Sequence, residues 1–277
     1  GLSRMRAYAV YTSLRYLLIA LGLGLGLLLE LPPEALPGIW SFSECVLFLA
    51  LLVELFSTVS LRRAVGWQRW LREHIDYGVR GFAAVLLFEI NSRLDIWMLG
   101  PRFSDSVVGV YSMAASMAEG ASQLPVVLQV NVNPQLAAHL AAGRQAEVQT
   151  LIARTRRWFV PLMALLSVIA VALYPLLIPW LTGHPEFGDG SVPFALLMAG
   201  LVLSAPWLPY NQILLMGSRP GWHTVYVAVA VVANVLGCVL LIPRYGPLGA
   251  AASTAVSLLL SALLLRRLAA ALLAIKL

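Results

Sequence analysis

The chain has 277 residues, of which 60% are hydrophobic and only 12% are charged. Soluble domains carry roughly 25% charged residues, so this composition excludes a soluble protein and indicates an integral membrane protein. The formal net charge of +6 does not imply a nucleic-acid partner. In so apolar a chain, the positions of the basic residues are more informative than the size of the charge.

Eight apolar segments are long enough to cross a bilayer as helices. A hydrocarbon core about 30 Å thick requires about 20 apolar residues per helix. We therefore predict an all-α, polytopic bundle of about eight transmembrane helices with short hairpin connections. The predicted spans are 10–29, 39–61, 80–100, 107–130, 158–181, 192–216, 222–243 and 247–270.

Lys and Arg residues are unequally divided between the two sides of this bundle. Fifteen lie on the side that holds both termini and the stretches 61–79 and 131–157, whereas only Arg102 and Arg244 lie on the other. Basic residues concentrate in cytoplasmic loops. The pattern predicts a multi-pass protein whose first partner is the lipid bilayer, with both ends of this segment in the cytoplasm.

The second span is followed by the polar stretch 62–79. Trp67, Trp70 and Leu71 recur there at helical spacing among arginines. This pattern is typical of an amphipathic helix that lies in the membrane interface, and we expect a linker between two bundles. Within the second span, Glu54 is deep enough to line a cavity or to pair with Arg93.

Four polar side chains interrupt the third span: Glu89, Asn91, Arg93 and Asp95. An ionisable group at the bilayer centre costs roughly 2.5–3.5 kcal/mol, so these groups require a bundle interior, a hydrated cavity or one another. Glu89 and Arg93 lie one turn apart on one face, whereas Asn91 and Asp95 lie one turn apart on nearly the opposite face.

These two polar stripes suggest two roles. We expect Glu89 and Arg93 to neutralise each other as a structural pair. Asp95 lies nearer the outer end, where we expect water to reach it, and with Asn91 it would line a path for a polar solute. The sequence leaves open which stripe faces the cavity.

Polar groups also interrupt the fourth and sixth spans. Glu119 and Gln123 lie one turn apart on a face that they share with serines. Because an unpaired lipid-facing carboxylate is costly, we expect Glu119 to line a cavity or to be paired. Asn211 follows Pro206 and Pro209 in the sixth span, where broken helices are a recurrent transporter feature and a simple bend is the alternative.

Signatures of enzymes and metal sites are not found in the sequence. The four histidines form no HExxH or other metal-binding spacing, and there is no Walker-type phosphate loop or GxSxG elbow. We therefore predict no catalytic residues, no metal and no cofactor.

Several pieces of the chain resemble one family in their order and spacing. They are NSRLDIWMLG from Asn91, SDSVVGVYSMAASMAE from Ser104, VNPQLA from Val132, MGSRPGWHTV from Met216 and IPRYGPLGAAASTAVS from Ile242. The chain resembles bacterial polysaccharide biosynthesis proteins, the O-antigen and lipid-linked oligosaccharide flippases of the multidrug/oligosaccharidyl-lipid/polysaccharide exporter (MOP) superfamily.

The resemblance implies two six-helix lobes around a central cavity that opens alternately to the two sides of the bacterial inner membrane. Residues 1–61 would then be two helices that end a first lobe, 62–79 the linker, and 80–277 a six-helix second lobe. The first four helices of the family would be absent, so the chain is expected to be a fragment or to act with a partner subunit.

The implied function is translocation of a lipid-linked oligosaccharide by alternating access, without chemistry on the substrate. A coupling ion is a further candidate partner. A drug/cation antiporter of the same superfamily and a non-transporting membrane scaffold are alternatives. A membrane-embedded enzyme of polysaccharide assembly is less favoured, because the outer loops are short.

Overall fold

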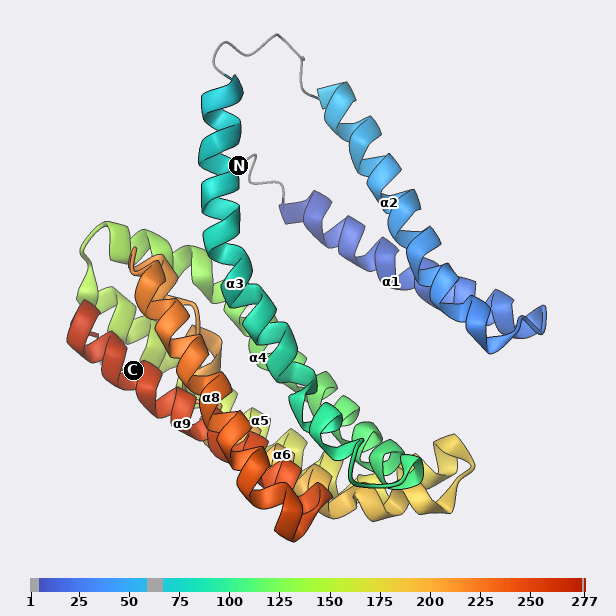
Figure 1. Cartoon of the computed structure of the whole chain (residues 1–277). Coiled ribbons are helices and arrows are strands. Elements are labelled where there is room, and N and C mark those ends of the chain that lie inside the picture. Colours follow the sequence, from blue (N-terminus) through green and yellow to red (C-terminus); the bar gives the residue numbers. More distant parts are fainter. Residues whose placement is uncertain (1–4, 59–66, 276) are drawn as a thin grey trace. The chain divides into compact units, whose positions relative to one another are not determined.

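The computed structural model describes residues 5–58, 67–275 and 277. Within these ranges every regular element is a helix, which confirms the all-α prediction (Figure 1). The chain forms two compact units, residues 1–74 and 75–277. The long helix α3 (Trp67–Leu99) belongs to both units, because the boundary falls within it.

The first unit contains a helical hairpin. Helices α1 (Met5–Leu28) and α2 (Leu36–Thr58) pack against each other and are joined through a single 3-10 turn, η1 (Pro33–Ala35). Gly22 allows a close approach, since a Cβ atom there would lie 2.4 Å from Cγ2 of Ile39. Arg15 and Glu44 join the helices on the outside by an ion pair of 2.7 Å.

The second unit contains the long helices of the chain. Its two longest, α4 and α5, are followed by shorter helices and then by the α8–α9 pair, which makes the most extensive helix contact. The elements are α4 (Asp105–Ala141), α5 (Gln145–Thr182), η2 (Pro185–Gly190), α6 (Ser191–Ser204), η3 (Leu208–Tyr210), α7 (Ile213–Met216), α8 (Pro220–Tyr245) and α9 (Pro247–Leu273).

Small residues allow these helices to approach closely, as is common where lipid removes the hydrophobic drive for helix association. A Cβ atom on Gly249 of α9 would lie 2.3 Å from the carbonyl oxygen of Leu241 on α8. One on Gly200 of α6 would lie 2.6 Å from Cα of Ala255 on α9. Helix α9 therefore packs against both neighbours at backbone distance.

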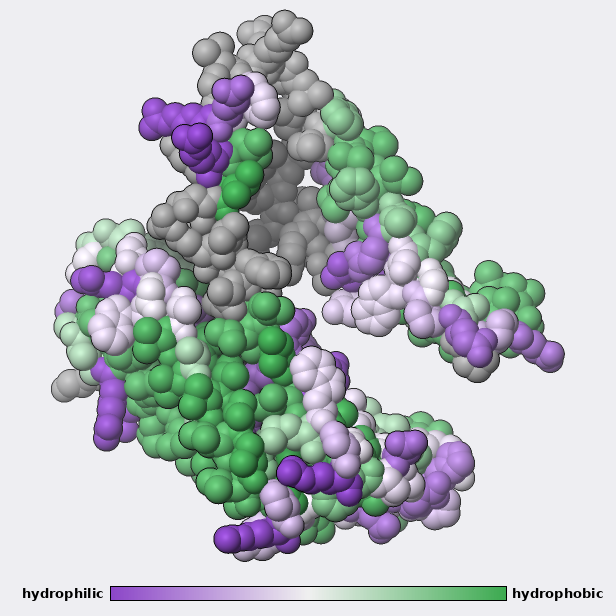
Figure 2. Space-filling view, in the orientation of Figure 1, coloured by the Kyte–Doolittle hydropathy of each residue, from purple (hydrophilic) through white to green (hydrophobic). Residues whose placement is uncertain are grey.

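Two clusters of buried apolar side chains hold the second unit together. The larger cluster includes Tyr111, Met163, Phe194 and Ile242, from α4, α5, α6 and α8. The smaller one, around Tyr210, joins the far ends of α4 and α5 to α7, α9 and the C-terminal residues. The visible face over α8 and α9 is almost continuously hydrophobic, as expected of helices that contact lipid (Figure 2).

Helices lie over all eight predicted spans, but with two differences in their extent. The sixth span is broken: α6 ends at Ser204, and a turn, η3 and the short α7 follow. The third span is part of the longer α3, so residues 67–79 of the predicted linker are helical and continuous with it. Residues 59–66 lie outside the described part of the chain.

By length and composition alone, five helical stretches of the described residues qualify as membrane spans. They are Leu36–Glu54, Gln145–Thr182, Pro185–Ser204, Pro220–Tyr245 and Pro247–Leu273. The apolar part of α1, Ser13–Leu28, is shorter. Helices α3 and α4 contain the polar side chains singled out above, and these side chains lower their hydropathy.

Candidate functional site

Asp95 lies in the packed interior of the second unit. Its side chain is only 5% exposed. The hydroxyl of Tyr111 on α4 donates a hydrogen bond to Oδ2, the hydroxyl of Thr254 on α9 approaches the same oxygen at 3.5 Å, and the amide of Ile96 donates to Oδ1 at 2.9 Å. The expectation that water reaches Asp95 from the outer end is therefore wrong.

Asn234 of α8 extends this network. Its side-chain amide donates to Oδ1 of Asn91 on α3 at 3.1 Å. The hydroxyl of Ser253 on α9 donates to the backbone carbonyl oxygen of Asn234 at 2.9 Å and to its Oδ1 at 3.1 Å. Thr254 lies 3.5 Å from the same side-chain oxygen.

We call these six residues the buried polar cluster: Asn91, Asp95, Tyr111, Asn234, Ser253 and Thr254. The cluster joins α3, α4, α8 and α9 within the apolar interior. Buried polar groups of this kind rigidify a core when each finds a partner. The stripe of Asn91 and Asp95 therefore packs against neighbouring helices.

The other stripe of α3 is exposed on the second unit. Arg93 pairs with Glu119 of α4 at 3.3 Å, and each side chain is 48% exposed. The predicted pairing of Arg93 with Glu89 is wrong, because the ion pair joins two helices instead of two turns of one helix. Glu89 and Gln123 are also exposed. We call Glu89, Arg93, Glu119 and Gln123 the exposed polar strip.

Removing one charge of the Arg93–Glu119 pair should cost little stability. Each side chain is about half exposed, so the pair is not part of the packed interior, and exposed ion pairs contribute roughly 0.2–1 kcal/mol. We expect Arg93→Ala and Glu119→Gln each to lower the free energy of unfolding by less than about 1 kcal/mol. Thermal unfolding of the purified protein in detergent measures this. A collapse of folded yield with Arg93→Ala would contradict the exposed placement.

The remaining two predicted site residues belong to neither group. Glu54 is half-buried on α2, in the first unit. Asn211 directly follows η3, at the break of the sixth span. Beside it, Gln212 accepts a hydrogen bond of 3.0 Å from the side-chain amide of Asn133 on α4.

Arg156 stabilises this break, a role that the sequence interpretation missed. Its Nε donates to the carbonyl oxygen of Pro206 at 2.7 Å, and its guanidinium lies 5.6 Å from the centre of the Trp207 ring. A proline break frees backbone carbonyls that need a new donor at membrane depth. The sequence carried no direct signal of this contact, because Arg156 precedes Pro206 by 50 residues and lies in the stretch 131–157, outside the predicted spans.

The side chains at these sites offer oxygen atoms and few other ligands. No group of three or more His, Cys, Asp or Glu side chains suited to a metal forms within residues 5–58 and 67–275. The buried polar cluster presents the carboxylate of Asp95, the amide oxygen of Asn234 and the hydroxyl of Thr254. Oxygen atoms of these types are the ligands that hard cations prefer.

The fold of the described residues is similar to the folds of two solved transport proteins. No protein-family model matches the chain, and no curated protein does. Among solved structures, it is similar to the lipid II flippase MurJ in an inward closed conformation, with a TM-score of 0.70 and 13% identity over 93% of this chain and 54% of that one.

A second solved structure is similar at 12% identity. It is a multidrug resistance transporter of the MATE family, of the MOP superfamily, in an outward-facing conformation, with a TM-score of 0.61 over 71% of this chain and 44% of that one. The chain thus shares the fold of these two structures and spans about half the length of each.

Proposed function

We propose that the chain is part of a flippase that translocates a lipid-linked oligosaccharide or polysaccharide precursor across the bacterial cytoplasmic membrane by alternating access. The observation that carries the proposal is the fold, which follows the lipid II flippase over 93% of this chain. The five sequence pieces that resemble oligosaccharide flippases, the first beginning at Asn91 and the last at Ile242, support the same substrate class.

The exposed polar strip supplies the polar face that such a substrate requires. A charged pair in the middle of two membrane-depth helices is costly against lipid, so Arg93 and Glu119 are best accommodated beside a hydrated cavity. We propose that this cavity is completed by further helices of a first lobe or by a partner subunit. Residues 1–61 would contribute the end of that lobe.

The buried polar cluster is proposed to bind the coupling ion. The Asp95 side chain accepts hydrogen bonds from neutral groups, which include Tyr111 and Thr254, and it is almost fully buried. An ionised carboxylate in such a place is costly unless it is neutralised. A proton or a monovalent cation bound at Asp95 would neutralise it, and its release would favour a different packing of α3 against α8 and α9.

The proposed function is tested by measuring transport with the full-length product of the gene. In proteoliposomes, a fluorescent lipid-linked oligosaccharide is expected to become inaccessible to a membrane-impermeant quencher as it crosses. The double variant Arg93→Ala, Glu119→Ala should fold and lower this rate about tenfold or more. Gly109→Ala on α4, which meets no atom within 4 Å, is the matched control.

The second candidate is a drug/cation antiporter, and the similarity to the MATE transporter favours it. Efflux of a small cationic dye with no movement of the lipid-linked sugar would support this reading and overturn the first. Binding of the sugar without movement of either probe would instead indicate a scaffold.

A further inference from the structure

The hairpin between α4 and α5 holds a pocket of ≈350 Å³ that several charged and polar residues line. It is lined by His139 at the end of α4 and, on α5, by Ala146, Glu147, Thr150, Leu151 and Arg154. None of these residues belongs to the buried polar cluster or to the exposed polar strip. The pocket is therefore a third site, distinct from both groups.

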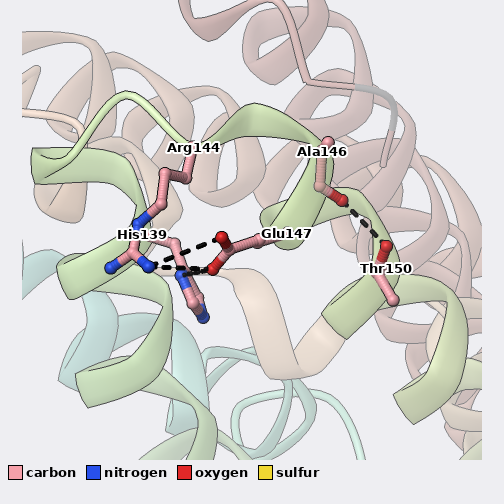
Figure 3. Close-up of polar contacts among 5 residues, drawn as sticks. All are labelled: His139, Arg144, Ala146, Glu147 and Thr150. Carbon is pink, nitrogen blue, oxygen red and sulfur yellow. Dashed lines mark hydrogen bonds and ion pairs between the residues drawn. The ribbon is translucent and has the colours of Figure 1, made fainter.

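The charges around this pocket are mostly positive. The carboxylate of Glu147 contacts two basic side chains: its Oε2 lies 2.7 Å from Nδ1 of His139 and 3.2 Å from Nη1 of Arg144 (Figure 3). Thr150 donates its hydroxyl to the carbonyl oxygen of Ala146 at 2.9 Å, as the same view shows. Arg154 has no carboxylate partner in the part of the chain that the structure describes.

The first turn of α5 adds to this positive field. The helix begins at Gln145, and Ala146 and Glu147 of its first turn line the pocket. The dipole at a helix N-terminus favours bound anions, although the amides of Gln145, Glu147 and Val148 already donate to the carbonyl oxygens of Gly143 and Arg144. Arg154 is therefore the group that would hold a phosphate in this small volume.

The same face of α5 continues into the membrane. Trp158, Leu162, Leu165 and Ile169 follow Arg154 at helical spacing, and all four are exposed. The stripe ends at the exposed Trp180, twenty-two residues beyond Trp158. These residues span about 33 Å of helix, close to the thickness of a bilayer core. Two tryptophans at that separation are typical of the two membrane interfaces.

We propose that this pocket binds the phosphate headgroup of an anionic membrane lipid whose acyl chains lie along the exposed stripe of α5. The geometry favours a lipid over free phosphate because the pocket opens one turn beyond the interfacial Trp158, on the same helix face. Anionic lipid bound here would anchor the α4–α5 hairpin at the membrane surface. The site is independent of the transported substrate.

Native mass spectrometry of the full chain in detergent tests this site. We expect phosphatidylglycerol to be retained in preference to phosphatidylcholine, and Arg154→Ala to weaken its retention about fivefold, the effect of one basic residue at an anionic membrane surface. Arg267→Ala, which removes one exposed charge from α9, is the control and should change nothing. Equal retention by Arg154→Ala and the wild type overturns the proposal.

A variant that is expected to strengthen lipid binding separates an effect on binding from an effect on folding. Glu147→Gln removes the carboxylate that engages His139 and Arg144, so it should raise the affinity for phosphatidylglycerol severalfold, whereas a purely structural role for these contacts would lower it. A competition experiment with inorganic phosphate distinguishes a lipid site from a site for free anions. If it competes with phosphatidylglycerol at equal concentration, the pocket is a site for free anions and the lipid proposal is wrong.

Discussion

Gly249→Ala should remove most of the folded protein. An added Cβ atom would lie 2.3 Å from the carbonyl oxygen of Leu241, 2.5 Å from its carbonyl carbon and 2.9 Å from the amide nitrogen of Ile242. These are backbone atoms inside α8, so no side chain can rotate away to relieve the clash. Overpacking typically costs roughly 1–3 kcal/mol, and we expect about 3 kcal/mol or more here. Fluorescence-detected size exclusion after heating measures the loss.

Gly109→Ala is the matched control, because an added Cβ atom there meets no atom within 4 Å. Alanine is favoured over glycine inside a helix by roughly 0.8–1 kcal/mol, so this variant should be at least as stable as the wild type. If both variants unfold at the same temperature, α8 and α9 do not pack at the described distance.

Asp95→Ala should be strongly destabilising, whereas Asp95→Asn should fold. Alanine leaves the buried hydroxyl of Tyr111 without its acceptor and removes one of the two acceptors near Thr254, and an unsatisfied buried polar group costs roughly 1–3 kcal/mol. We expect a total loss of about 2–4 kcal/mol for alanine, since asparagine retains an acceptor oxygen. Thermal unfolding of the two variants and of Tyr111→Phe separates these contributions.

The asparagine variant also tests the proposed coupling ion. Asparagine is neutral, so Asp95→Asn should fold while its transport no longer responds to an imposed gradient of protons or of a monovalent cation. Undiminished coupling in a folded Asp95→Asn protein would place the ion elsewhere. If alanine and asparagine at this position are equally stable, Asp95 is not buried as described.

The position of every long helix was predictable, because a run of about 20 apolar residues is typical of a membrane-spanning helix. The polar residues of α3 and their division into two stripes were also predictable from helical spacing. Spacing does not reveal which neighbouring helix supplies a partner. For this reason the spacing did not predict that Arg93 pairs with Glu119 of α4, although Glu89 lies only one turn away on α3.

The burial of Asp95 was missed because distance from a helix end was taken as a measure of water access. Its exposure depends instead on α4 and α9, which cover it from elsewhere in the sequence. Asn234 carried a signal that went unused: a single amide within the apolar span 222–243 needs a partner at membrane depth. Its partner, Asn91, is 143 residues away in sequence.

The α4–α5 hairpin is longer than a bilayer requires. The two helices have 37 and 38 residues, and a helix of this length extends about 55 Å, nearly twice a hydrocarbon core. The buried side chains of Val132, Leu136, Val148 and Ile152 tie the connected end of the hairpin to α7, α9 and the C-terminal residues. This end is therefore fixed to the rest of the second unit and moves together with α7 and α9. A spin label on Gly143, in the connection itself, would report such a movement as a change in its distance to a label elsewhere on the chain.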